Sequence, residues 1–247
     1  MLPEFVQYIL FIGIVALMFL LRLDAKRFSA AEWDTEDGDW RVWMARITWY
    51  AAGLALALIV FALHPTPVSD LNLVLANDSG EALVLGLLFG GIGIIGAFAL
   101  ALLRHGRITF PPPARYPGGV LYAVGTANFD EFLFRGVILG LLLMLGLPDW
   151  MAVVGMAFIY AFAVRAGTGS RGIVMLAVWL AIGLAGGVLV LMTAGIGAAF
   201  VGHAITRFAL FLTMGPPERA AVEQVTPSTG GTGDDGAYVI PPRSGAH

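Results

Sequence analysis

The segment Asp130-Glu131-Phe132-Leu133-Phe134-Arg135-Gly136 places three ionisable side chains in the middle of an apolar stretch that runs from Gly118 to Leu147. A charged side chain at the centre of a bilayer costs about 2.5–3.5 kcal/mol on insertion scales, and charges at this depth typically mark a functional site. Glu131 and Arg135 are four residues apart and can pair along one helix face. Asp130 has no such local partner. This segment therefore decides both the fold and the position of any site.

The composition is that of a membrane protein. Hydrophobic residues make up 58% of the 247 residues and charged residues 13%, and the mean hydropathy is +0.83. A helix needs about 20 apolar residues to cross a hydrocarbon core about 30 Å thick. Seven segments are long enough, or nearly so, and they predict an all-α polytopic bundle of about seven transmembrane helices: Phe5–Leu23, Trp43–Leu63, Ala82–Leu103, Gly118–Leu147, Leu147–Val164, Ile173–Thr193 and Gly195–Met214.

The loops between these segments alternate in charge. Loops rich in lysine and arginine stay in the cytoplasm. The first, third and fifth loops are basic, whereas the second, fourth and sixth hold no basic residue. The basic residues of the three loops are Arg22, Lys26, Arg27, Arg41, Arg104, Arg107, Arg115, Arg165 and Arg171. This alternation predicts an N-terminus outside and a C-terminus in the cytoplasm. Thirteen arginines against one lysine, with many Ala, Gly and Leu residues, suggest a GC-rich bacterial genome, so we expect a multi-pass protein of the bacterial inner membrane.

The chain divides into a transmembrane domain, residues 1–214, and a tail, residues 215–247. The tail is rich in Gly, Pro, Ser, Thr and charged residues, so it cannot bury enough apolar surface to offset its chain entropy, and we expect it to be flexible and cytoplasmic. The net charge of −3 and the lack of a basic stripe argue against a nucleic-acid partner. The absence of cysteine excludes disulfides and thiolate metal sites.

Glycines recur within the apolar spans. The stretch Gly91–Gly96 matches the GxGxxG dinucleotide-binding pattern, but it lies inside an apolar span with no strand before it, so we reject that interpretation. Glycines let helices approach closely in lipid. We expect close helix packing at Gly86, Gly90, Gly93, Gly96, Gly136 and Gly140.

One histidine lies within a predicted span. His203 is in the last span, and Arg207 follows one turn later on the same face. At about 1.5 Å per residue from the cytoplasmic helix ends, Asp130 lies roughly 18 Å along its helix and His203 about 16 Å along its own. We therefore expect the carboxylates of Asp130 or Glu131 to lie within direct or one-water reach of His203 or Arg207.

Two motifs carry a resemblance. Asp130, Glu131, Arg135 and Gly136 match a motif of two acids followed after three residues by arginine and glycine, and His203 matches the first position of an HxxxN or HxxxD motif. With the Gly-rich stretch 181–196 between them, residues 82–212 resemble the CAAX-protease and bacteriocin-processing family of intramembrane proteases, also called the Abi or lysostaphin-resistance-like family.

The resemblance implies an active site in which the first acid and a histidine of an FxxxH motif activate a water, while the last histidine and its Asn or Asp stabilise the oxyanion. The chain departs from it at three positions. Asp130 is one methylene shorter than the family's glutamate, Phe162 stands where the FxxxH histidine is expected, and Arg207, a permanent cation, replaces the Asn or Asp. A general base contributes about 10²–10⁴-fold to a rate, and phenylalanine supplies none. The resemblance therefore implies a degenerate site.

Three classes of function remain. In the first, Asp130, Glu131, Arg135, His203 and Arg207 form a buried structural network, and the protein is a non-proteolytic scaffold or accessory subunit that binds lipids and other integral membrane proteins. In the second, Asp130, Glu131 and His203 serve an active CAAX-type endopeptidase. A transporter is the third, although no inverted repeat is visible. One histidine and two carboxylates could in principle hold a metal ion, but the positive charge of two nearby arginines would repel it. We therefore expect no metal and no cofactor. We favour the first.

Overall fold

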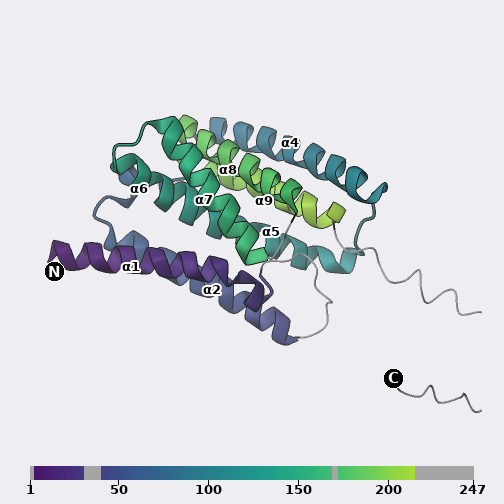
Figure 1. The fold of residues 1–247 in the computed structure, drawn as a ribbon, viewed down its shortest axis with the longest axis horizontal. Helices are drawn as coiled ribbons and strands as arrows, with labels where there is room; N and C mark the ends of the chain where they lie inside the picture. The colour runs from purple at the N-terminus through teal and green to yellow at the C-terminus, as the bar shows by residue number, and fades with distance from the viewer. Residues whose placement is uncertain (1–2, 31–39, 169–171, 215–247) are drawn as a thin grey trace, which may run out of the picture. The chain divides into compact units, whose positions relative to one another are not determined.

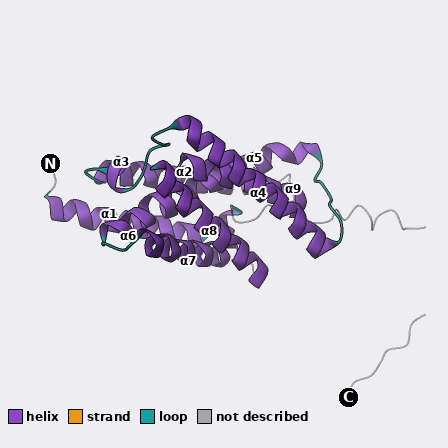
Figure 2. Cartoon of the chain, turned by 90° about the horizontal axis from the view of Figure 1, so that it is seen from above, coloured by secondary structure: helices purple, strands orange, loops and turns teal. Residues whose placement is uncertain are grey.

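The computed structural model describes residues 3–30, 40–168 and 172–214, and every regular element in these ranges is helical (Figures 1 and 2). The predicted all-α class is therefore confirmed for the described chain. The predicted tail lies outside the described residues. The α-helices are α1 Glu4–Leu23, α2 Trp40–Leu63, α3 Pro67–Asp70, α4 Ser79–His105, α5 Tyr116–Asp130, α6 Leu139–Met144, α7 Asp149–Thr168, α8 Ile173–Thr193 and α9 Gly197–Met214.

Five of the described helices are long and apolar enough to cross a membrane by length and composition, namely α1 from Phe5, α2, α4, α7 and α8. The predicted short fifth span, Leu147–Val164, is the 20-residue helix α7. The predicted fourth span is a run of consecutive helical segments, α5, a π-helical segment Glu131–Ile138 and α6. The last span is the shorter apolar helix α9. These helices are those of a multi-pass membrane protein.

The π-helical segment coincides with the charged motif. It begins at Glu131, directly after Asp130 ends α5, and continues to Ile138. In a π-helix the backbone hydrogen bonds skip one more residue than in an α-helix. Such segments are rare in proteins, and those that occur often lie at functional sites. The apolar pattern predicted a plain helix here. The widened turn instead places the acids of the motif at a change in helix type.

Glycines of α4 bring it against α9, and Figure 1 shows the two helices side by side. A Cβ on Gly86 would lie 2.9 Å from Cβ of Val201, and one on Gly90 would lie 2.8 Å from Cβ of Ile205. Gly93 faces Thr206 at even closer range. The predicted role of these three glycines is therefore confirmed.

The other predicted packing glycines behave differently. No atom of the described residues lies within 4 Å of a Cβ on Gly96, so the prediction of close packing at this glycine is wrong. Gly136 and Gly140 are close-packed against the last residue of the short helix α3 and the turn that follows it, with backbone oxygens of Leu71 and Asp70 at 3.3 and 2.6 Å from the added Cβ atoms. The spacing of the glycines does not show which segment packs against each of them, because that depends on the topology of the chain.

The neighbouring pair Gly90 and Gly91 provides a matched test of this packing. Gly90→Leu is expected to lower the stability by about 1–3 kcal/mol, because a side chain there overlaps Ile205 and forces α4 away from α9. Gly91→Leu, on the same turn with nothing within 4 Å of its Cβ, should stay within about 0.5 kcal/mol of the wild type. Thermal unfolding in detergent measures both. Equal effects of the two substitutions would show that α4 does not pack on α9 through Gly90.

Helices α1 and α2 lie side by side (Figure 1), and their packing positions the end of α1. Trp49 of α2 is fully buried, and its indole N–H donates to the carbonyl oxygen of Leu21 at 2.9 Å. The same indole packs on the ring of Phe129 in α5, with ring centroids 4.5 Å apart. This contact holds Leu21, and with it Arg22, close to the Asp130 end of α5.

Candidate functional site

The five side chains singled out from the sequence meet in the core. Asp130, Glu131, Arg135 and His203 are fully buried, and Arg207 is 1% exposed. His203 Nδ1 lies 2.6 Å from Glu131 Oε1, and Arg207 Nη2 lies 2.6 Å from Asp130 Oδ2. The expected proximity of the two motifs is therefore confirmed as geometry.

Asp130 is held between two guanidinium groups. Arg207 donates to Oδ2 from α9, and Arg22 of α1 donates from Nε to Oδ1 at 2.6 Å and from Nη2 to Oδ2 at 3.3 Å. Both carboxylate oxygens thus accept charge-assisted hydrogen bonds, which are short and about twice as strong as neutral ones. The aspartate joins the first and last helices of the described bundle to α5.

The position of Arg22 corrects its assignment to the first basic loop, and it adds a second arginine partner for Asp130 that the sequence did not predict. The structure places Arg22 in the last turn of α1 with no exposed surface. Gly167 of α7 makes room for it, because a Cβ there would lie 3.0 Å from Arg22 Nη1. One signal was available, since Arg22 precedes the last residue of the predicted span Phe5–Leu23.

The hydrogen bonds of His203 determine its tautomer. Arg207 Nε, which can only donate, lies 2.9 Å from His203 Nε2, so Nε2 is an acceptor. The ring proton is then on Nδ1, which donates to Glu131 Oε1. His203 is therefore a neutral imidazole fixed at both nitrogens, and the hydroxyl of Tyr160 lies 3.1 Å from the same Nε2.

Arg207 is the most connected member of the cluster. Besides Asp130 and His203, it donates from Nη1 to the hydroxyl of Tyr122 at 2.8 Å, and its guanidinium lies 4.7 Å from the ring centre of Trp179. Sequence reasoning missed Tyr122, Tyr160 and Trp179, because an aromatic residue within an apolar span resembles an ordinary core or lipid-facing residue.

Arg135 occupies the opposite side of Glu131. Its Nη1 lies 3.3 Å from Glu131 Oε1, its Nη2 donates to the carbonyl oxygen of Ile182 at 3.0 Å, and its guanidinium stacks 4.1 Å from the ring centre of Tyr160. Gly186 of α8 leaves space for it, since a Cβ there would lie 2.8 Å from Arg135 Nε. The pairing predicted from the spacing of Glu131 and Arg135 is confirmed.

Phe162, which the resemblance places where an FxxxH histidine is expected, lies outside the cluster. Phe162 is 54% exposed and stacks on Phe158, which is 47% exposed, with ring centroids 6.4 Å apart. Tyr160, two residues earlier in α7, is the side chain that this helix directs at His203. A histidine at position 162 would therefore not reach Glu131 or His203 on this helix face.

The charges of the cluster set its chemistry. With His203 neutral, three guanidinium groups (Arg22, Arg135 and Arg207) face two carboxylates, and all of them are buried. Among the described residues no group of three or more His, Cys, Asp or Glu side chains could hold a metal ion, and the excess positive charge opposes a cation. The side-chain oxygen Glu131 Oε2 has no hydrogen-bond partner among the described residues.

The chain matches no family model, no curated protein sequence and no solved structure.

Proposed function

We propose that this chain is a multi-pass protein of the bacterial inner membrane that serves as a non-proteolytic scaffold or accessory subunit for other integral membrane proteins. It has seven spans, with the N-terminus outside and the C-terminus in the cytoplasm, and a bundle of the CAAX-protease type whose polar centre has become structural. The alternating basic loops and the helices found at each predicted span support the topology.

The observation that carries the proposal is the position of Arg207. It fills the place of the family's Asn or Asp, donates to Asp130 and occupies Nε2 of His203. Arg22 donates to the other carboxylate oxygen of Asp130. Each oxygen of Asp130 therefore already accepts a hydrogen bond from an arginine, and neither is free to accept a proton from water. Water activation requires a free acceptor within hydrogen-bond reach. Asp130 and Arg207, which stand at the positions of the catalytic acid and the oxyanion-stabilising residue, form an ion pair instead, so Asp130 cannot activate water.

A second candidate, an intramembrane endopeptidase, is favoured by one observation. Glu131 Oε2 has no hydrogen-bond partner among the described residues, while Oε1 is oriented by His203 Nδ1 at 2.6 Å. A glutamate held in this way can accept a proton from a water molecule beside Oε2. In this mechanism Glu131, rather than Asp130, is the general base.

Purification of the full chain in mild detergent tests the proposal. We expect a stoichiometric integral membrane partner, and no cleavage of prenylated or leader-type peptides above the background of a Glu131→Gln control. The Phe162→His variant should remain inactive, because position 162 lies on an exposed face of α7.

Two outcomes would contradict this. Turnover by the wild type that Glu131→Gln abolishes would establish the endopeptidase. Purification of the chain as a monomer without a partner, under conditions that preserve membrane complexes, would exclude the scaffold function.

A further inference from the structure

A cavity of about 400 Å³ lies between the C-terminal end of α4 and the N-terminal end of α8, away from the buried ion cluster. Its size is within the range of about 300–1,000 Å³ that small-molecule sites occupy. The described residues that line it are Leu100, Leu103, Arg104, Gly172, Val174 and Met175.

The interior of the cavity is apolar and its rim faces the surroundings of the bundle. Leu100 and Met175 are 9% and 5% exposed, whereas Leu103 and Val174 are 86% and 56% exposed. Because the exposed apolar side chains of a membrane bundle face acyl chains, the cavity opens toward lipid rather than toward a protein core. Its walls therefore suit a hydrocarbon chain.

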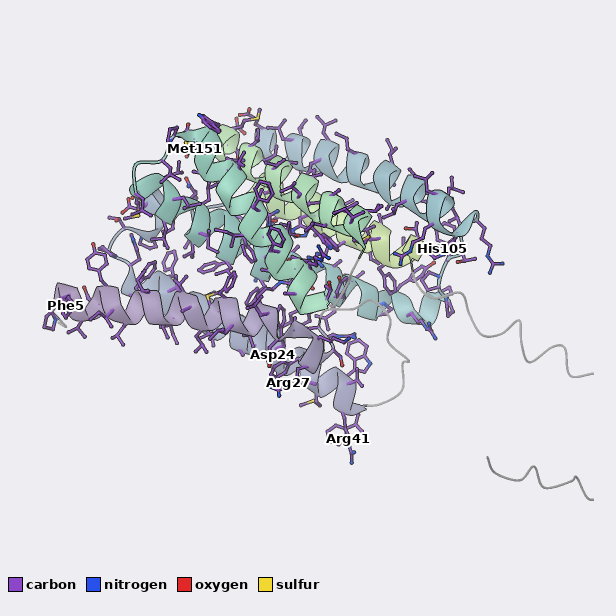
Figure 3. All side chains as sticks on the ribbon, in the orientation of Figure 1. Phe5, Asp24, Arg27, Arg41, His105 and Met151 are labelled. Carbon is purple, nitrogen blue, oxygen red and sulfur yellow. The ribbon has the colours of Figure 1, made fainter. Side chains whose placement is uncertain are left out.

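Positive charge is concentrated at one end of this cavity. Among the described residues Arg104 is the one charged side chain that lines it, and Arg104 is exposed and forms no ion pair with an acid of these residues. His105, labelled in Figure 3 at the end of α4, and Arg107 follow it and are exposed. The first turn of α8, capped by Gly172, carries no acid to offset its own positive helix end. The cavity thus complements a ligand with an apolar chain and an anionic head.

We propose that this cavity binds one anionic phospholipid, with an acyl chain between α4 and α8 and the phosphate on Arg104. Arg104 is the penultimate residue of α4, which is where a spanning helix reaches the headgroup layer. Basic pockets between helices at the cytoplasmic surface bind anionic headgroups. The assignment to the cytoplasmic leaflet rests on the orientation proposed above, whereas the site itself does not depend on the scaffold function.

Native mass spectrometry of the full chain in detergent tests this, with dioleoylphosphatidylglycerol and dioleoylphosphatidylcholine as probes. The wild type is expected to retain phosphatidylglycerol about fivefold more strongly than phosphatidylcholine. Arg104→Gln should abolish this preference, and Val174→Trp should reduce binding of both lipids by filling the cavity. Ile173→Trp, on the neighbouring exposed residue that does not line the cavity, and Arg27→Gln, at another exposed basic site, should bind like the wild type.

Three outcomes would overturn the proposal. Equal retention of the two lipids by the wild type would exclude a phosphate site at Arg104. A loss with Arg104→Gln but not with Val174→Trp would show surface attraction without the cavity. Full displacement by glycerol 3-phosphate, which has no acyl chain, would show that the ligand is a soluble phosphate. Melting temperatures of the variants within a few degrees of the wild type ensure that folded protein is compared.

Discussion

Arg207→Asn is expected to lower the free energy of unfolding by about 3–5 kcal/mol, the range typical of breaking a buried ion pair. The substitution introduces the asparagine of the HxxxN motif that this segment resembles, so a working active site of that kind would tolerate it. In this structure it removes the short hydrogen bond to Asp130, the donor to His203 Nε2 and the donor to Tyr122. Asparagine is too short to replace these contacts at once, so Asp130, His203 and Tyr122 each lose one buried hydrogen-bond donor.

Thermal or denaturant unfolding in detergent measures this effect. Arg104→Asn is the matched control, because Arg104 is an exposed arginine at a helix end without an acidic partner among the described residues; it should change stability by no more than about 0.5 kcal/mol. If Arg207→Asn expresses and melts like the wild type, Arg207 is not a counter-ion of the cluster, and the divergent active site becomes the better account.

Arg22→Ala is expected to destabilise the protein by about 3 kcal/mol or more. The guanidinium is fully buried against Asp130, so its removal leaves a gap and withdraws the 2.6 Å hydrogen bond to Oδ1. It also detaches the end of α1 from α5, which should increase proteolysis of the α1–α2 pair.

Arg27→Ala is the control for Arg22→Ala. Arg27 pairs with Asp24 at 3.2 Å, but its side chain is 78% exposed. Exposed pairs contribute about 0.2–1 kcal/mol. Similar losses from the two alanine substitutions would mean that Arg22 lies in a solvated loop, as the count of basic residues alone suggests.

The sequence predicted that Asp130 or Glu131 lies within reach of His203 or Arg207, and the reason is physical. Charges deep in an apolar span must find partners, and the fixed rise of a helix places Asp130 and His203 at similar depths. Both inferences need only local geometry. They do not depend on knowing how the helices are arranged.

Arg22, Tyr160 and the π-helical segment were beyond such reasoning. Arg22 is 108 residues from Asp130 in the sequence. A basic residue at the end of a span can lie either in the loop or in the core, and only the tertiary packing decides between the two. Tyr160 and Phe162 are two residues apart on one helix, and only the rotation of α7 decides which of them faces His203. The spacing of Glu131 and Arg135 permits pairing in either helix type, so it did not reveal the π-helical segment.

A double-mutant cycle of Asp130→Asn and Arg207→Asn tests most directly whether the cluster is an ion network that stabilises the bundle. Each single substitution should cost about 3–5 kcal/mol. Asp130→Asn leaves the buried guanidinium groups of Arg22 and Arg207 without their carboxylate, and Arg207→Asn withdraws the 2.6 Å charged hydrogen bond from Asp130 Oδ2. The double variant removes both charges of the pair, so it should be more stable than the sum of the single effects by about 2 kcal/mol. Effects that add within about 0.5 kcal/mol would show that the two residues do not interact, and would contradict the account.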